Sequence, residues 1–452
     1  MKTTIKVLIS LALFLITIQS FGQYFGQNKV NYEKFDFKIY ETPHFQIYNY
    51  LDNNRAVQDL GRQSEKWYQR HFSIFRDTVL NNPLILYNNH ADFQQTTVIS
   101  GLINVGTGGV TEGFRKRVVM PFMGSNRETD HVLGHEMVHV FQYNIIHKND
   151  SLGFESLRNL PLWMVEGLAE YMSIGPSDNK TAMWMRDAVI QDDVPSIKKM
   201  TREPNNYFPY RYGHAFWSFI TGVWGDAMIK PVLYTTAKYG IDRAVDSLFG
   251  ISKDSLSTLW QNSVKKTHKP FIQDSIKPVG EPLFTGKNSG DLNLSPVLSP
   301  DGKNVTFLTN KNVISIDLMV ANTETREIKK KLTSTVRKSH IDDFNYIESS
   351  GSWSPDGESY VLTTFSKGRN KLLIANVEGD NVKVEKEIAP KDVKSFNNPE
   401  WSPDGNKILI NGLVNGQSDL YVYDLKKKEV EQITDDKYSD LHASWSSNGE
   451  KI

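Results

Sequence analysis

Two histidines and a glutamate stand at a spacing that suits a metal ion. His135, Glu136 and His139 form an HExxH pattern. Residues four apart lie on one face of a helix, so both imidazoles can reach one ion. Glu136 projects about 100° around the helix from His135, where its carboxylate can take a proton from a water beside the ion. The pattern predicts a zinc site that activates water; the alternative is a surface helix that carries two histidines by chance.

The residues around this pattern favour a helix. No glycine or proline interrupts the segment after Gly134, and Asp130 is a candidate cap for its start. Two more histidines, His131 and His147, flank the pattern, and we expect both to be surface residues. The apolar contacts come from Val132, Leu133, Val138, Phe141, Tyr143 and Ile146.

A second segment downstream carries two carboxylates one helical turn apart. Residues 161–171 read Pro-Leu-Trp-Met-Val-Glu-Gly-Leu-Ala-Glu-Tyr, with Glu166 and Glu170 at i and i+4. Together with the HExxH pattern, this segment resembles the gluzincin metallopeptidases, and its spacing is closer to their peptidase-MA-like branch. By that resemblance, Glu166 is the third zinc ligand and Glu170 orients a ligand histidine. Such a site leaves a fourth position open, as in catalytic zinc centres; the alternative for either glutamate is an exposed helix charge.

The same resemblance implies two further parts of a site. The strand expected at residues 118–122 would be an edge strand that pairs with an extended peptide, although a core strand is the equal alternative. The resemblance also implies a Tyr or His that stabilises the oxyanion, and we select Tyr212, the alternative being that Tyr212 packs in an aromatic core. The candidates before the later helix are Tyr207, Tyr210, Arg211, Tyr212 and His214.

The elements that would position these residues mix strands and helices. Residues 35–50 alternate apolar and polar residues as a strand pair does, and residues 52–75 show nearly helical spacing. Residues 84–87 read as a short buried strand, and residues 182–268 are helical throughout. The resemblance covers about residues 35–271 and implies an α+β zincin-like metallopeptidase domain.

The second half of the chain repeats itself. Ser-Pro-Asp-Gly occurs at residues 299–302, 354–357 and 402–405, and Ser-Ser-Asn-Gly at 446–449. Pro presets the turn dihedral, Asp bonds the local backbone and Gly takes positive φ, so each motif predicts a hairpin turn between strands. A period of about 40 to 55 residues is typical of a propeller. The repeats resemble those of TolB-like (WD40-like) propellers, over about residues 283–452.

Two further expectations concern this propeller. The turn aspartates could bind calcium, but no further oxygen ligands are spaced around them, so we favour a structural turn. Only about three and a half blades are visible, whereas propellers close with about 4 to 8. We therefore expect an incomplete all-β propeller, in a chain that is a piece of a longer protein.

The N-terminus and the composition bear on location and partners. Two lysines, an apolar run over residues 7–18 and small residues up to Gly22 are the parts of a secretory signal peptide. That run is too short to span a bilayer comfortably, and no later stretch is long enough, so we expect no transmembrane segment in the mature chain. Lys plus Arg and Asp plus Glu both number 52, which argues against nucleic-acid binding. With no cysteine, any metal must use histidines and carboxylates.

These patterns predict four segments: a signal peptide at 1–22, a gluzincin-like metallopeptidase domain at 23–271, a linker at 272–290 and TolB-like blades at 291–452. We expect an exported Zn²⁺-dependent metallopeptidase, periplasmic or extracellular, that hydrolyses peptide or protein substrates. The propeller would bind the substrate or a partner in the cell envelope. The alternative is an envelope scaffold that acts through its propeller and whose metallopeptidase domain is catalytically vestigial.

Overall fold

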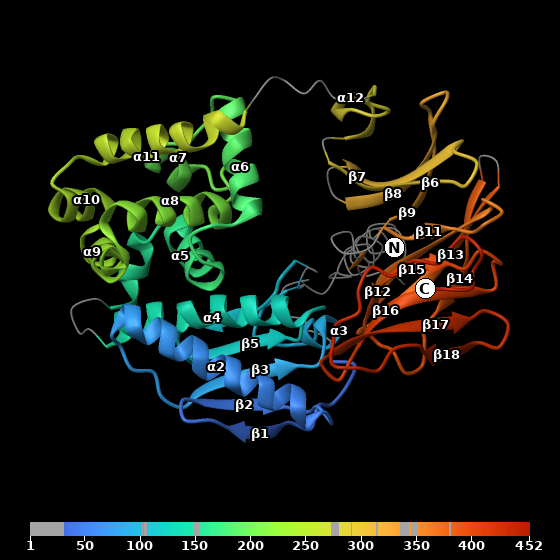
Figure 1. Ribbon diagram of the computed structural model, residues 1–452, viewed down its shortest axis with the longest axis horizontal. Coiled ribbons are helices and arrows are strands. Elements are labelled where there is room, and N and C mark those ends of the chain that lie inside the picture. The colour runs from blue at the N-terminus through green and yellow to red at the C-terminus, as the bar shows by residue number, and fades with distance from the viewer. Residues whose placement is uncertain are drawn as a thin grey trace, which may run out of the picture.

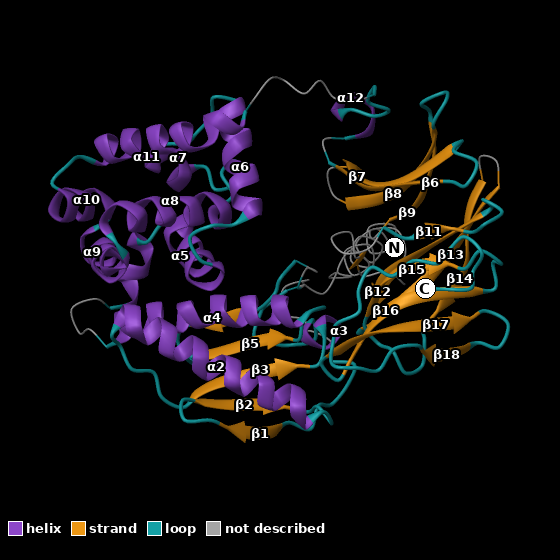
Figure 2. Ribbon diagram, in the orientation of Figure 1, coloured by secondary structure: helices purple, strands orange, loops and turns teal. Residues whose placement is uncertain are grey.

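The computed structural model describes residues 31–101, 103, 106–148, 153–272, 280–290, 292–312, 315–334, 343–344, 350–378 and 381–452. The predicted signal peptide lies outside these described residues. An N-terminal part mixes helices with a sheet, and a C-terminal part consists of three further sheets (Figures 1 and 2). Within the part of the chain described, no helix is long and apolar enough to cross a membrane.

The N-terminal part is built on a five-stranded sheet with the order β1-β2-β3-β5-β4. β1 and β2 pair antiparallel, as predicted for residues 35–50, whereas β2, β3 and β5 run parallel. The edge-strand hypothesis for residues 118–122 is wrong: β5 is an inner strand, and β4 pairs antiparallel with it at the edge. The strands are β1 (Lys38–Glu41), β2 (Phe45–Asn49), β3 (Asn82–Tyr87), β4 (Val110–Glu112) and β5 (Arg117–Pro121).

Helices α2 (Asn54–Phe75) and α4 (Asn126–His147) pack together beside this sheet (Figure 1). Their close contact depends on Gly134, where an added Cβ would lie 2.7 Å from the Trp67 ring. The N-cap of α4 is Ser125, whose hydroxyl accepts from the Glu128 amide at 3.2 Å. The prediction of Asp130 as the cap is therefore wrong. Asp130 falls within the helical segment, and its carboxylate accepts from Trp67 Nε1 at 2.9 Å.

A lobe of helices follows, as predicted for residues 182–268. Its core contains three fully buried indole rings, Trp163, Trp217 and Trp260. The helical elements, with the short α3 that precedes β4, are α3 (His90–Phe93), η1 (Phe154–Asn159), α5 (Leu162–Ile174), α6 (Asn179–Ile190), α7 (Ile197–Arg202), α8 (Pro209–Trp224), η2 (Asp226–Met228), α9 (Ile229–Tyr239), α10 (Ile241–Phe249), α11 (Lys253–His268), η3 (Lys269–Phe271) and α12 (Gly286–Ser289).

The C-terminal part forms three antiparallel blades. The first comprises β6 (Asn293–Leu298), β7 (Asn304–Asn312), β8 (Ser315–Asn322) and β9 (Ile328–Ser334). The second comprises β10 (Asp343–Phe344), β11 (Ser352–Trp353), β12 (Ser359–Ser366), β13 (Arg369–Glu378) and β14 (Asn381–Ile388). The third comprises β15 (Phe396–Trp401), β16 (Lys407–Val414), β17 (Gln417–Asp424) and β18 (Glu429–Gln432).

The repeated Ser-Pro-Asp-Gly motifs are the predicted hairpin turns between neighbouring strands of each blade. In the third blade, Asp404 Oδ1 accepts from Ser402 Oγ at 2.6 Å and from the Asn406 amide at 3.0 Å. Gly405 follows with a φ of +71°. Because the carboxylate already serves the turn, this geometry favours the structural interpretation over calcium binding.

The third blade contacts the N-terminal part at the start of α4. Ser418 Oγ donates to the carbonyl of Gly124 at 2.6 Å, and the Gly416 amide donates to Asn88 Oδ1 at 3.0 Å. Leu413 joins the main hydrophobic core. Since Gly124 directly precedes the N-cap Ser125, this blade buttresses the helix that carries the HExxH pattern.

Candidate metal centre

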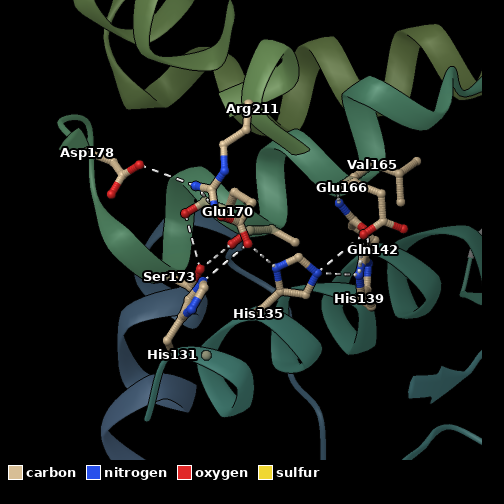
Figure 3. A network of polar contacts seen from close by, with 12 residues as sticks. His131, His135, His139, Gln142, Val165, Glu166, Glu170, Ser173, Asp178 and Arg211 are labelled. Atoms are coloured by element: carbon tan, nitrogen blue, oxygen red, sulfur yellow. Dashed lines mark hydrogen bonds and ion pairs between the residues drawn. The ribbon is translucent and has the colours of Figure 1, made fainter. Parts of the chain in front are cut away.

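Three side-chain atoms from α4 and α5 meet at one point. His135 Nε2 lies 3.3 Å from His139 Nε2 and 3.3 Å from Glu166 Oε2, and His139 Nε2 lies 3.4 Å from the same oxygen (Figure 3). The two histidines share one face of α4 because they are four residues apart. The structure thus brings together the three residues that the sequence suggested as ligands.

The triangle of donor atoms has the size that zinc requires. A tetrahedral ion about 2.0–2.1 Å from each donor holds those donors about 3.3–3.4 Å apart. The three observed distances fall in that range. Two imidazole nitrogens and a carboxylate oxygen are also donors that zinc prefers. The residues present therefore fit a zinc ion with one position left open.

The other ring nitrogen of each histidine is held by a side-chain oxygen. His139 Nδ1 donates to Gln142 Oε1 at 2.8 Å, and Gln142 Nε2 donates in turn to the carbonyl of Val165 at 3.1 Å. His135 Nδ1 donates to Glu170 Oε1 at 3.1 Å. With Nδ1 as the donor, the Nε2 lone pair of each ring faces the centre, as a metal ligand must.

Glu170 lies at the middle of a buried charge network, with 4% of its surface exposed. Besides His135, its carboxylate contacts His131 Nε2 at 3.2 Å and Arg211 Nη1 at 3.1 Å. Arg211 also bonds Asp178 Oδ2 at 3.2 Å (Figure 3). Glu170 is therefore placed to orient His135, and His131 belongs to this network and is more than the surface residue we expected.

Two glycines allow the network to form across α5 and α8. A Cβ on Gly167 would lie 2.3 Å from the backbone of Gly213, and one on Gly213 would lie 2.0 Å from the carbonyl of Trp163. No side chain fits at this crossing. The close approach brings the start of α8, with Arg211, to Glu170 on α5.

The charges of the centre favour a cation. Burial works to lower the pKa of His135, but hydrogen bonds with Glu166 and Glu170 outweigh it and raise that pKa to about 10. Burial likewise works to raise the pKa of Glu166, but the positive charge of His139 and hydrogen bonds from both histidines hold it well below its usual range. A metal ion at the triangle would neutralise Glu166 and take the place of the proton on His135 Nε2.

Glu136 points to the edge of the sheet, where β4 holds it. Thr111 Oγ1 lies 2.7 Å from Glu136 Oε2 and 2.9 Å from the Glu136 carbonyl oxygen. Gly109 leaves room for this side chain, since an added Cβ there would lie 2.9 Å from Glu136 Cγ. The carboxylate is buried and fixed, beside the only edge strand on this side of the described sheet.

The structure brings Tyr210 to the centre, and it does not bring Tyr212 there. The Tyr210 ring stacks on His135, with ring centroids 5.6 Å apart and an angle of 11° between the planes. Burial and the negative charge of Glu166 raise its pKa, so the phenol stays protonated and can donate. Tyr212 is buried instead against Tyr207 and Trp184, the aromatic packing that was its alternative.

Sequence reasoning missed Gln142 and Thr111, and it preferred Tyr212 to Tyr210 among its candidates. Two residues along a helix differ by about 200° in direction, so Tyr210 and Tyr212 face opposite sides of α8. Gln142 stands three residues after His139, a spacing that places both on one helix face and could have been noticed. Thr111 lies in a glycine-rich stretch and gave no signal.

Comparison with known proteins addresses the C-terminal part. Residues 336–452 match the family model of the TolB beta propeller domain, PD40. These residues form a TolB-like propeller region. The match covers the second and third blades, and the first blade, which lies outside it, has the same antiparallel strand order. A comparison with curated proteins finds no match for this chain.

Solved structures similar to the chain include other propellers. TolB from Acinetobacter baumannii is 21% identical over 37% of this chain and 38% of its own, with a TM-score of 0.29. A putative TolB from Agrobacterium tumefaciens is 19% identical over 33% of this chain and 48% of its own, with a TM-score of 0.26. The β-propeller domain of the Trilobed protease from Pyrococcus furiosus is 18% identical, covering 31% and 41%, with a TM-score of 0.22. The chain spans less than half the length of each.

Proposed function

We propose that the chain is a zinc-dependent peptidase of the gluzincin type, with a zincin-like domain that holds the ion on His135, His139 and Glu166. The observation that supports this most is the triangle of three donor atoms 3.3 to 3.4 Å apart. A structural zinc site is normally closed by four protein ligands, whereas this set provides three. The open position suits catalysis.

The fixed carboxylate of Glu136 serves as the general base. A zinc ion bound at the centre would supply Lewis acidity, polarising the substrate carbonyl and lowering the pKa of a water to about 7. Glu136 accepts the proton of the attacking water as the water oxygen adds to the carbonyl carbon. The same carboxyl group then gives the proton to the amine nitrogen as the C–N bond breaks.

Two neighbouring groups complete the proposed site. The protonated phenol of Tyr210 stacks on His135 and can donate to the oxyanion that develops on the carbonyl oxygen. β4, at the edge of the sheet and bonded to Glu136 through Thr111, offers backbone groups with which an extended peptide can pair. Tyr210 thus replaces Tyr212 as the candidate that stabilises the oxyanion.

The propeller and the N-terminus support a location outside the cytoplasm. The lysines and short apolar run within residues 1–22 have the pattern of a secretory signal peptide. We propose an exported protein of the cell envelope whose TolB-like propeller binds a protein substrate or an envelope partner. The contact of the third blade with Gly124 supports a role of the propeller in binding the substrate, because the propeller lies beside the start of α4.

Hydrolysis of a peptide library by the purified protein tests the proposal. We expect cleavage by the zinc-loaded protein, loss of cleavage with a chelator and recovery on adding zinc. If the protein carries a full complement of zinc and still cleaves nothing, the peptidase proposal fails. The scaffold alternative, in which the propeller alone acts, would then take its place.

A further inference from the structure

An aromatic row leads outward from the metal centre. It consists of Tyr210, Phe208 and Trp184, from the start of α8 and from α6. Tyr210 stacks on His135; Phe208 stacks on Tyr210 with centroids 5.1 Å apart and an angle of 25°; and Trp184 follows Phe208 at 5.8 Å. Each ring is thus in contact distance of the next.

The outer two rings of this row are accessible. Phe208 is 42% exposed and Trp184 is 36% exposed, and Met183, which precedes Trp184 in α6, is 55% exposed. Single exposed apolar residues are common on protein surfaces. A contiguous group of exposed apolar residues next to a reactive centre is uncommon, and such groups mark places where a ligand binds. Burial of these faces by a ligand would therefore be favourable.

The dimensions of the row match a short stretch of extended peptide. Successive rings lie 5 to 6 Å apart, and an extended chain advances about 3.3 Å per residue. A substrate bound at the metal centre would place its side chains over Phe208 and Trp184 within a few residues of the bond that is cleaved. Flat aromatic faces bind other aromatic or large apolar side chains by offset stacking.

We propose that this aromatic row is a substrate subsite that selects peptides with an aromatic side chain a few residues from the scissile bond. The inference rests on the proposed peptidase function, because the inner end of the row is the metal centre. Its occupant is a side chain of the substrate, since the row is continuous with His135 through Tyr210. Phe208 and Trp184 act as specificity residues and take no part in the chemistry.

Peptide binding to the zinc-loaded Glu136→Gln protein tests the subsite apart from catalysis. The probes are alanine hexapeptides in which one Phe is moved through every position, with the all-alanine peptide as reference. We expect the Phe peptide to bind about tenfold more tightly than the reference at its best position. Phe208→Ser and Trp184→Ser, each added to that protein, should reduce this preference to about twofold or less.

A matched control and the contrary result complete the test. Phe271→Ser removes an aromatic ring that is 71% exposed and lies outside the row, so it should keep the preference. Zinc content and circular dichroism should not change in any of these variants. Equal binding of all peptides, or a preference that survives both row substitutions, overturns the subsite. If wild-type protein cleaves peptides without any Phe preference, the subsite fails while the peptidase function stands.

Discussion

Glu136 and the two histidines beside it are held by different partners. Gln142 and Glu170 hold the rings of His139 and His135, whereas Thr111 on β4 holds the Glu136 carboxylate. Because different residues hold the histidines and Glu136, the two histidines and the glutamate can serve different roles. The histidines can be fixed as ligands while Glu136 stays free of the metal and available for proton transfer.

Replacing Glu136 by Gln should abolish hydrolysis and leave zinc bound. The amide keeps the shape of the side chain, and its oxygen can still accept from Thr111, but it cannot take a proton from water. We expect kcat/KM to fall by about a hundredfold or more, with unchanged zinc content by elemental analysis. Activity close to that of the wild type would mean that the hydrolysis arises at another site.

Gln142 should matter for the metal although it is no ligand. Gln142→Leu keeps similar bulk and removes both the bond to His139 Nδ1 and the bond to the carbonyl of Val165. Loss of such an orienting partner typically weakens metal binding by about 10- to 100-fold. Competition with a chromophoric chelator measures this affinity. An unchanged zinc affinity would show that the ring of His139 needs no such support.

The sequence allowed a large part of this candidate site to be predicted, because its candidate ligands lie in short patterns. HExxH fixes two histidines on one helix face, and Glu166 followed from the resemblance of the second segment. Tyr210 could not be chosen over Tyr212 because the rotation of α8 about its axis depends on tertiary packing, here on Gly167 against Gly213. Thr111 reaches Glu136 only through strand pairing across the sheet.

At the scale of elements, helix α2 packs against α4 through His71. This residue is fully buried; its Nε2 lies 3.0 Å from the carbonyl of Gly134, and its ring stacks near Trp67. Burial lowers the pKa of His71 to about 4. The folded protein therefore requires the neutral ring at the place where α2 supports α4, the helix that carries the HExxH pattern.

This burial predicts a dependence of stability on pH. Because the folded pKa of His71 lies below the unfolded value of about 6.5, its neutral form contributes stability above pH 6.5 that is lost as the pH falls toward 4. Between pH 7.5 and 5 the loss should be about 2 kcal/mol in the free energy of unfolding. His71→Gln can still donate to the carbonyl of Gly134 and does not titrate. Between pH 7.5 and 5 its free energy of unfolding should therefore fall by about 2 kcal/mol less than that of the wild type. Urea unfolding of the wild type and of His71→Gln, both freed of metal with a chelator, measures the difference between their free energies of unfolding at each pH. A difference that does not vary with pH would contradict this prediction.

The positions of strands and helices along the sequence were predicted better than the order of the strands in the sheet. The alternation over residues 35–50 and the spacing over residues 52–75 are local features, and β1, β2 and α2 appear there. Which strand lies at the edge is a long-range property. Residues 118–122 are apolar and buried because β5 lies between β3 and β4, in agreement with the core strand that was the equal alternative.

Across the whole molecule, the third blade and the N-terminal part are joined at Gly416. This residue has a φ of +75°, and an added Cβ would lie 3.0 Å from the ring of Phe122, which follows β5. Its amide also bonds Asn88. The hairpin between β16 and β17 thus fits closely against the loop that leads into α4.

Gly416→Ala should loosen this contact. The left-handed backbone costs a non-glycine residue about 1–2 kcal/mol, and the new methyl group must also displace Phe122. Gly302→Ala is the control, because Gly302 has a φ of +70° and nothing within 4 Å of the added Cβ. Hydrogen exchange should become faster at residues 122–125 in Gly416→Ala only. Equal exchange in the two variants would show that the blade does not support this loop.

The measurement that tests the central claim most directly is the titration of zinc into the metal-free protein. Three donors at tetrahedral spacing predict one zinc ion per chain. Glu136→Gln should bind the same amount, and His139→Ala should lose the stoichiometric site. If the wild-type protein neither contains zinc when purified nor binds it at one equivalent, His135, His139 and Glu166 do not form a metal centre.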